Sequence, residues 1–203
     1  MAKVVIDLSM SLDGFIAGPN DGAEHPLGER GGEHVFDWFT TGAAPGDHET
    51  RFAPEGANRQ VVEEMFAETG AMLTGRRTYE IAHGWNGEHP VNAIPVFILT
   101  HDPPADPPHG RSELVFITDG IESGVRKAKA AAGDKNVGIG GASAAQQALR
   151  AGLVDEIRLH IAPILLGDGV RLFEHLGDHA VQLELLETVT GPKATHLSYR
   201  VAA

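Results

Sequence analysis

The sequence contains no cysteine, which excludes disulfide bonds, thiolate metal sites and a cysteine nucleophile. Aromatic residues make up only 6% of the chain, and no apolar run approaches the roughly 18 residues that a membrane-spanning helix needs. Positive charge is also scarce, because 16 Lys and Arg stand against 28 Asp and Glu, a net charge of −12. Such a surface repels nucleic-acid phosphates and anionic lipid headgroups. We therefore expect no nucleic-acid or membrane partner.

The first residues lack the apolar run and the small-residue cleavage site of a secretory signal. Together with the absence of cysteine, this favours a cytoplasmic location. Of the 203 residues, 42% are hydrophobic and 22% are charged, a composition typical of a globular protein with a buried core. The length favours one domain over residues 1–203. Residues 18–56 are rich in Gly, Pro, His and acidic residues and are expected to form a long loop insertion, interrupted by a helical turn at 33–39.

Hydrophobic periodicity predicts the regular elements of this domain. Strands are expected at 4–9, 71–74, 94–100, 114–118, 136–139 and 157–161, and helices at 58–68, from 75, at 121–132 and after 143. The segments 181–189 and 195–201 alternate between apolar and polar residues and predict a hairpin that turns near Gly191. Alternating strands and helices with a strand-rich end predict an α/β fold, a mixed and mostly parallel sheet with an antiparallel C-terminal edge.

Two local expectations follow from the same patterns. Asn58 is available as the N-cap of the helix at 58–68, because its short side chain can accept a hydrogen bond from the first turn. Arg158 and His160 alternate with apolar residues in the strand at 157–161, which predicts a strand with one exposed face.

The most informative junction is Gly140-Gly141-Ala142-Ser143, where a strand runs through a glycine pair into a helix. Such a junction presents backbone N–H groups and the positive end of a helix dipole to an anion, and glycine allows the anion to approach closely. The segment is not the G-x-G-x-x-G fingerprint of Rossmann folds. A tight turn that requires positive φ explains the glycines equally well.

A second junction, Gly75-Arg76-Arg77-Thr78, also follows a strand and begins a helix, and it adds two guanidinium groups and a hydroxyl. Two neighbouring strand ends with anion-binding groups indicate a ligand with more than one phosphate, such as a dinucleotide across the carboxyl edge of the sheet. The alternative is that both arginines are solvated surface residues.

The sequence gives little support for a metal site or for nucleophilic catalysis. Most of the eleven histidines are dispersed among loops, and His175 and His179 enclose a glycine rather than a catalytic glutamate. Ser9, Ser11 and Ser143 lack the G-x-S-x-G elbow of hydrolases. We expect no metal site and no nucleophilic catalysis.

The order of these motifs resembles the dihydrofolate reductase-like superfamily, and most closely the C-terminal reductase domain of the bifunctional deaminase-reductase of riboflavin biosynthesis. The resemblance rests on the segments SMSLDGFIA at 9–17, LTGRRTYE at 73–80, TDGI at 118–121, IGGA at 139–142, DEIRL at 155–159 and LLGDG at 165–169. It implies a three-layer α/β/α fold and a reductase that uses NADPH, with NADH as an alternative. The implied substrate is a small heterocycle or a molecule of the ribosylaminopyrimidine type, as for 5-amino-6-(5-phosphoribosylamino)uracil reductase, and the implied assembly is a homodimer.

The resemblance also assigns residues to the cofactor. They are Ser9, Ile16, Gly75, Arg76, Arg77, Thr78, Thr100, Ile139, Gly140, Gly141, Ala142 and Ser143. In this assignment Ser9 and Ile16 border the nicotinamide, the segment 75–78 holds the adenosine phosphates, and the segment 139–143 holds the pyrophosphate and nicotinamide side. Residues 12–17 correspond to a mobile loop that closes over the nicotinamide.

Two departures from the family pattern restrict the function. Dihydrofolate reductases carry a carboxylate three residues before a Trp-Phe pair, but here that position is Val35, so dihydrofolate is an unfavourable substrate unless Glu33 or Asp37 substitutes. Relatives often place a basic residue near the 2′-phosphate after the strand that ends at Thr100, whereas this chain has His101-Asp102. Preference for NADPH over NADH then depends on Arg76 and Arg77.

The proton donor is the least constrained part of the site. If residues 33–39 are helical, Asp37 faces the substrate half of the cleft and is the candidate catalytic acid. The alternatives are that Asp37 is a solvated acid and that water protonates the product directly. Two other functions stay open from the sequence: a nucleotide-binding module without turnover, and a purely structural α/β domain.

Overall fold

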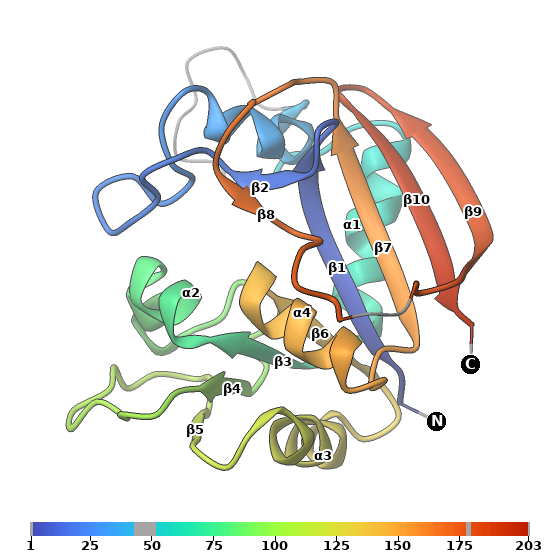
Figure 1. Ribbon diagram of the computed structural model, residues 1–203. Coiled ribbons are helices and arrows are strands. Elements are labelled where there is room, and N and C mark those ends of the chain that lie inside the picture. Colours follow the sequence, from blue (N-terminus) through green and yellow to red (C-terminus); the bar gives the residue numbers. More distant parts are fainter. Residues whose placement is uncertain (1, 43–51, 178–179, 203) are drawn as a thin grey trace.

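The computed structural model describes residues 2–42, 52–177 and 180–202. At its centre is an eight-stranded sheet with the order β5-β4-β3-β6-β1-β7-β10-β9 (Figure 1). In that order the strands are Leu114–Ile117, Val96–Leu99, Thr69–Gly75, Asn136–Gly140, Val4–Ser11, Glu156–Ala162, Ala194–Val201 and Leu183–Gly191. Only β10 runs antiparallel to its neighbours, β7 and β9, and the other pairs are parallel. The predicted mixed sheet with an antiparallel C-terminal edge is confirmed.

Helices cover both faces of the sheet, so the predicted three-layer α/β/α architecture is also confirmed (Figure 1). One face carries α3 (Ile121–Ala132) and α4 (Ala142–Arg150). The opposite face carries α1 (Ala57–Glu68), α2 (Arg76–Ile81) and two short 3₁₀ helices, η1 (Gly32–Thr40) and η2 (His83–Gly87). A small antiparallel sheet of β2 (Phe15–Ala17) and β8 (Val170–Arg171), which the sequence patterns did not predict, lies beside this body.

The largest part of the core lies between the sheet and the α3–α4 layer. Ile121, Val125, Ala128 and Ala132 are all buried there, as their helical spacing predicts. Because side chains alternate along a strand, every second residue of β1, including Val4 and Ile6, faces this layer, and the residues between them face the other one. Asp7 and Ser9 of β1 therefore point toward η1 and α1.

Two local predictions differ from the structure. Strand β7 lies between β1 and β10 and has no exposed face at His160, which is 4% exposed because η1 covers it. Asn58 does not cap α1, since Gly56 occupies the N-cap position. The Asn58 amide is completely buried and donates instead to the carbonyl oxygens of Trp38 and Pro192, at 3.0 and 2.9 Å. Burial between three elements thus decides the role of this side chain.

The predicted insertion at 18–56 contains η1 at the expected helical turn, while residues 43–51 of it lie outside the described ranges. The following turn, η2, has left-handed backbone angles at successive residues, including His83, Trp85 and Asn86 with φ of 48–51°. Within the described ranges, no helix combines the length and the apolar character needed to cross a membrane.

Candidate functional site

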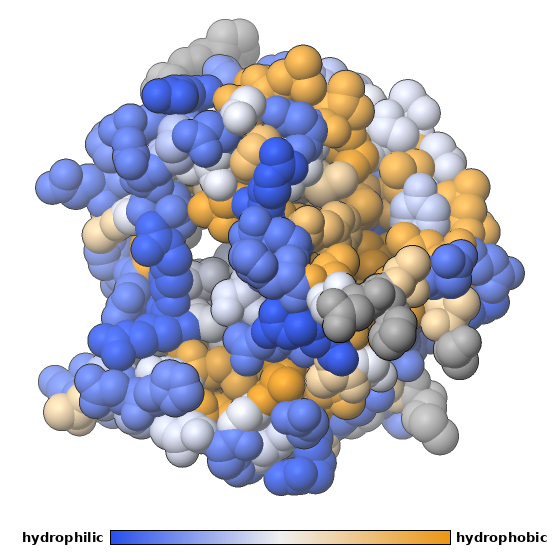
Figure 2. Space-filling model, in the orientation of Figure 1, coloured by the Kyte–Doolittle hydropathy of each residue, from blue (hydrophilic) through white to orange (hydrophobic). Residues whose placement is uncertain are grey.

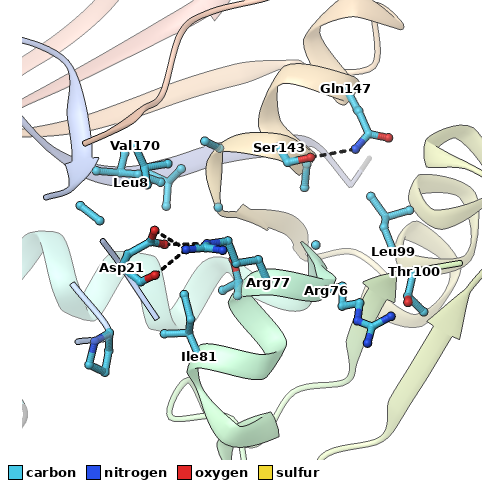
Figure 3. Close-up of a pocket in the computed structure, with 18 of the residues that line it drawn as sticks. Leu8, Asp21, Arg76, Arg77, Ile81, Leu99, Thr100, Ser143, Gln147 and Val170 are labelled. Atoms are coloured by element: carbon cyan, nitrogen blue, oxygen red, sulfur yellow. Dashed lines mark hydrogen bonds and ion pairs between the residues drawn. The ribbon is translucent and has the colours of Figure 1, made fainter. Parts of the chain in front are cut away.

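A cleft of about 560 Å³ opens at the carboxyl ends of β1, β3, β4 and β5. The first turns of α2 and α4 form its floor, and the loop after β2 forms one wall (Figure 3). The space-filling view shows the hollow bordered by hydrophilic side chains (Figure 2). Because parallel strands end at a common edge, groups from segments distant in sequence meet here, and ligands of open α/β sheets bind at such edges. The cleft is therefore the principal candidate site.

Ten of the twelve residues predicted to bind a cofactor line this cleft. They are Ser9, Ile16, Gly75, Arg76, Arg77, Thr78, Thr100, Gly141, Ala142 and Ser143. The other two lie beneath it: Ile139 is a core residue of β6, 1% exposed, and the Gly140 carbonyl accepts a hydrogen bond of 2.8 Å from Thr74 Oγ1. The two motifs that the sequence singled out, 75–78 and 140–143, thus meet in space.

The glycine pair has a structural requirement of its own. Gly141 has φ +83°, and a Cβ at this position would lie 2.4 Å from Thr78 Oγ1. A side chain would therefore strain the backbone and separate the two motifs. The tight turn considered as an alternative is thus present, and it leaves the first N–H groups of α4 without helical partners. Ala142 and Ser143 carry these groups and line the cleft, so turn and anion site are compatible.

Both arginines of the cleft are held by carboxylates. Arg77 binds Asp21 with Nε–Oδ2 at 2.9 Å and Nη2–Oδ1 at 2.5 Å, and it also donates to the Asp21 carbonyl (Figure 3). Arg76 Nε lies 2.6 Å from Glu80 Oε1, and Nη1 lies 3.8 Å from Asp102 Oδ2. The hydrogen bond from Arg77 to Asp21 raises the pKa of the arginine. Each guanidinium is half exposed or more and keeps its charge at the cleft.

At the β1 end of the cleft, Ser9 is held by an aromatic side chain. Trp38 Nε1–H donates to Ser9 Oγ at 2.9 Å, and both residues are buried, Trp38 completely. A serine hydroxyl has two acceptor lone pairs and one donor proton. Trp38 uses an acceptor site, and within residues 2–42, 52–177 and 180–202 no group accepts from Ser9 Oγ, so the hydroxyl proton can be donated to a ligand in the cleft.

The loop predicted to be mobile is tied down in this structure. Asp13 accepts hydrogen bonds from Ser11 Oγ at 2.6 Å, Leu166 N at 3.1 Å and Gly167 N at 2.7 Å. Burial raises the pKa of the Asp13 carboxyl, but these hydrogen bonds together lower it below its usual value. The Arg171 guanidinium also lies 4.4 Å from the ring centre of its neighbour Phe15. These contacts join residues 13–15 to the segment 166–171.

Asp37, the predicted proton donor, is not among the residues that line the cleft. Its carboxylate lies 2.9 Å from Lys193 Nζ and 3.3 Å from His34 Nδ1, on the outer side of η1. Its catalytic role stays a prediction that this geometry does not support.

Several lining residues have no role that the sequence patterns predict. Asp21, Pro26 and Leu27 come from the irregular segment after β2, where no periodicity marks a role, and Phe36 lies on η1. Thr118 and Gly120 follow the end of β5 and belong to the segment TDGI, which carries the resemblance. In the described part of the chain no three His, Asp or Glu residues are grouped closely enough to hold a metal ion.

Comparison with known proteins places this arrangement in a family. The model of the family described as the RibD C-terminal domain matches residues 2–197. The chain belongs to the RibD C-terminal domain family. The resemblance inferred from the motifs is therefore confirmed, and it extends over nearly the whole chain, including the insertion at 18–56.

Individual relatives are distant. Two Bacillus subtilis (strain 168) proteins, YyaP and YwjB, both named uncharacterized, are 27% and 24% identical, over 93% and 97% of this chain and 88% and 97% of their own lengths. A Shewanella sp. PV-4 protein named for riboflavin biosynthesis superposes with a TM-score of 0.70 at 22% identity over 100% of both chains. A Thermotoga maritima deaminase/5-amino-6-(5-phosphoribosylamino)uracil reductase gives a TM-score of 0.62 at 15% identity, over 99% of this chain and 57% of its own. These two likenesses show a common fold.

Proposed function

We propose that this protein is an NAD(P)H-dependent reductase that transfers a hydride to a small heterocycle of the ribosylaminopyrimidine type. The observation that carries the proposal is the meeting of residues 75–78, 141–143, Ser9 and Ile16 around one cleft. The resemblance to the family assigns these segments to different parts of one dinucleotide. Membership in the RibD C-terminal domain family supports the same activity.

The residues of the cleft fit a dinucleotide. A volume of about 560 Å³ lies within the range of roughly 300–1,000 Å³ that small-molecule sites occupy. Arg76, Arg77 and Thr78 offer cationic and hydroxyl groups for phosphates, and the free N–H groups at the start of the nine-residue α4 offer a second anion-binding position. Leu99 and Ile117 provide apolar walls between polar ends.

When bound, the cofactor would supply the hydride. The protein then has to hold the nicotinamide in place and exclude water. Ile16 and Phe36 are apolar lining residues near the β1 end, and Ser9 donates its free hydroxyl proton to a polar group of the ligand. The Asp13 contacts hold the 12–17 loop, of which Ile16 and Ala17 line the cleft, against residues 166–167.

We base the proposed substrate class on the family and on one departure from the dihydrofolate reductase pattern, at Val35. The Thermotoga maritima relative is named as a reductase of a phosphoribosylaminouracil. Val35, where dihydrofolate reductases have a carboxylate, is fully buried among Phe15 and Leu166. An apolar residue at this position cannot bind the protonated ring of a pterin, so we propose a pyrimidine rather than dihydrofolate.

A binding module without turnover is the second candidate. The lining residues include the titratable groups Asp21, Arg76, Arg77 and His101, of which Asp21 is engaged by Arg77. Among the described residues of the lining, none offers a carboxylate or imidazole beside Ser9. If substrate protonation requires a side chain, the same cleft would bind the dinucleotide without reducing anything.

Turnover separates the two candidates. The assay follows NADPH absorbance with a ribosylaminopyrimidine and, in parallel, with dihydrofolate, after calorimetry has established cofactor binding. The reductase predicts multiple turnovers with the pyrimidine and none with dihydrofolate. Tight NADPH binding without oxidation by any pyrimidine would favour the binding module, and absence of NADPH and NADH binding would refute both.

The proposal includes a homodimer. The edge strand β9 exposes Leu183, Leu185 and Leu186, at 43%, 57% and 40%, and an exposed apolar edge strand favours association. Sedimentation velocity is expected to give twice the chain mass of 21.5 kDa, and Leu185→Lys is expected to shift the protein to monomer. A monomer at high micromolar concentration would contradict the dimer.

A further inference from the structure

A buried hydrogen-bonded chain connects three strands and a helix behind the cleft. Asp7 Oδ1 of β1 lies 2.8 Å from His160 Nε2 of β7, and His160 Nδ1 lies 2.8 Å from His196 Nδ1 of β10. His196 Nε2 then lies 3.0 Å from Asn58 Oδ1 of α1. The histidines are 4% and 5% exposed and Asn58 is completely buried, whereas Asp7 is half-buried and borders a cavity together with both histidines.

Hydrogen-bond chemistry fixes the protons at one end of this chain. Asn58 Nδ2 donates to two carbonyl oxygens, those of Trp38 and Pro192, which can only accept. The amide orientation is therefore unambiguous, and Asn58 Oδ1 is an acceptor. It follows that His196 carries its proton on Nε2, since otherwise two acceptors would face each other at 3.0 Å.

The contacts of His160 with Asp7 and with His196 require one additional proton. A neutral His160 that donates from Nε2 to the Asp7 carboxylate would have a bare Nδ1, opposite the bare Nδ1 of His196 at 2.8 Å. Two lone pairs at this distance repel each other. We infer that the Asp7–His160 pair holds one proton more than a carboxylate and a neutral imidazole, with His160 Nδ1–H donating to His196, and that this proton positions Trp38 and the Ser9 hydroxyl at the cleft.

The cavity beside the pair is lined mostly by acidic groups. Its charged residues besides Asp7 are Lys3 before β1, Glu64 and Glu68 from α1, Glu156 and Arg158 from β7, and Glu187 from β9. The two cations pair with Glu156 and Glu68, so Asp7 has no fixed cation as its partner among these residues. Burial and the charge of His160 lower the pKa of His196 to about 4, which keeps His196 as the neutral acceptor near neutral pH.

The network touches the cleft through Trp38. Its indole lies against both imidazoles, with ring centroids 4.5 Å from His160 and 4.9 Å from His196, and its carbonyl accepts from Asn58. The indole N–H donates to Ser9, which lines the cleft. Loss of the extra proton would place the Nδ1 lone pairs of His160 and His196 opposite each other. Their repulsion would displace the Trp38 indole, which lies against both imidazoles and binds Ser9. Asp7 and His160 are thus positioning residues, and their effect on catalysis rests on the proposed function.

Nitrogen NMR of the ¹⁵N-histidine-labelled protein tests the proton directly. His160→Gln and His196→Gln assign the two signals, and the wild-type protein provides the measurement. At pH 7 we expect a proton on His160 Nδ1 and a bare Nδ1 on His196. Observation of His160 as the neutral tautomer with its proton on Nε2 alone would overturn the inference.

The link to the cleft is tested with a single indole reporter. The chain has two tryptophans, so Trp85→Phe leaves only the Trp38 indole N–H signal. Removal of the extra proton by raising the pH is expected to shift this signal together with the His160 nitrogen signals. Asp7→Asn is expected to abolish the shift, because the introduced amide can donate to His160 Nε2 and satisfy the chain without the extra proton. The matched exchange His109→Gln, at an exposed side chain, should leave the shift unchanged.

These outcomes are independent of cofactor binding. A Trp38 signal that stays fixed while the His160 nitrogen signals change would refute the positioning role. If the signals behave as expected but NADPH fails to bind, the proposed function fails and the proton assignment stands.

Discussion

Arg77 and Asp21 form a two-pronged ion pair across the mouth of the cleft, with Nη2–Oδ1 at 2.5 Å and Nε–Oδ2 at 2.9 Å (Figure 3). The two residues are 56 positions apart, one on α2 and the other on the loop after β2. A carboxylate in this position occupies the guanidinium edge that a phosphate would bind. Asp21 therefore competes with a phosphorylated ligand for Arg77.

Removal of this carboxylate should tighten cofactor binding. Asp21→Asn is expected to lower the Kd of NADPH up to about fivefold, because exposed ion pairs contribute up to roughly 1 kcal/mol. Calorimetry at low ionic strength measures the change, and added salt should reduce it. Glu24→Gln, an exposed acid of the same loop, removes the same charge and serves as the control. Weaker NADPH binding by Asp21→Asn than by the control would mean that Asp21 supports the ligand.

Arg76 is expected to distinguish the two nicotinamide cofactors. Arg76→Ala should weaken the binding of NADPH about tenfold more than the binding of NADH, since a charge-assisted hydrogen bond to a phosphate contributes roughly 1.5 kcal/mol. Arg111→Ala removes an exposed arginine that pairs with Glu88 away from the cleft, and it should change neither affinity. If Arg76→Ala lost affinity for NADPH and NADH equally, the assignment of Arg76 to the 2′-phosphate would be refuted.

The bond between Trp38 and Ser9 should appear as an energetic coupling. Ser9→Ala leaves the buried indole N–H without an acceptor and is expected to lower the free energy of unfolding by about 1–3 kcal/mol. Trp38→Phe in the Ser9→Ala background removes that donor as well, so the double variant should lose about 1 kcal/mol less than the sum of the single variants. Urea unfolding of the four proteins measures the cycle. Strict additivity would show that the contact contributes nothing.

The Asp13 contacts predict an acid-sensitive loop. Because the folded pKa of Asp13 is lowered, its contribution to stability is complete above its unfolded pKa of 3.8 and is lost as the pH falls through the lower folded value. Asp13→Asn should therefore reduce the melting temperature at pH 6, and the difference should shrink below pH of about 4. Asp168→Asn, an exposed acid of the facing loop, is the control. A difference that is constant from pH 6 to pH 3 would contradict this role.

Much of the fold could be predicted because its elements carry strong local patterns. The spacing of Ile121, Val125, Ala128 and Ala132 predicts the buried stripe of α3, and glycines after strands mark both junctions of the cleft. Parallel strands bring such junctions to one edge of a sheet. This geometric rule made the cleft predictable from motifs that are distant in sequence.

The side chains that the patterns misjudged act through tertiary contacts. His160 alternates as an exposed residue would, yet η1 buries it, and Asn58 stands where a cap is expected but binds two other elements. Asp21 and Leu27 come from an irregular segment, where no period links residue type to position. Burial by a distant segment leaves no local signal, so the network behind the cleft could not be predicted.

We propose that residues 75–78 and 141–143 form one dinucleotide site together with Ser9 and Ile16. Backbone amide NMR of the ¹⁵N-labelled protein during titration with NADPH tests it most directly. We expect saturable shifts at the amides of these segments, all with one Kd and one ligand per chain. Absence of shifts at millimolar NADPH, or shifts confined to the opposite end of the sheet around β9, would contradict the claim.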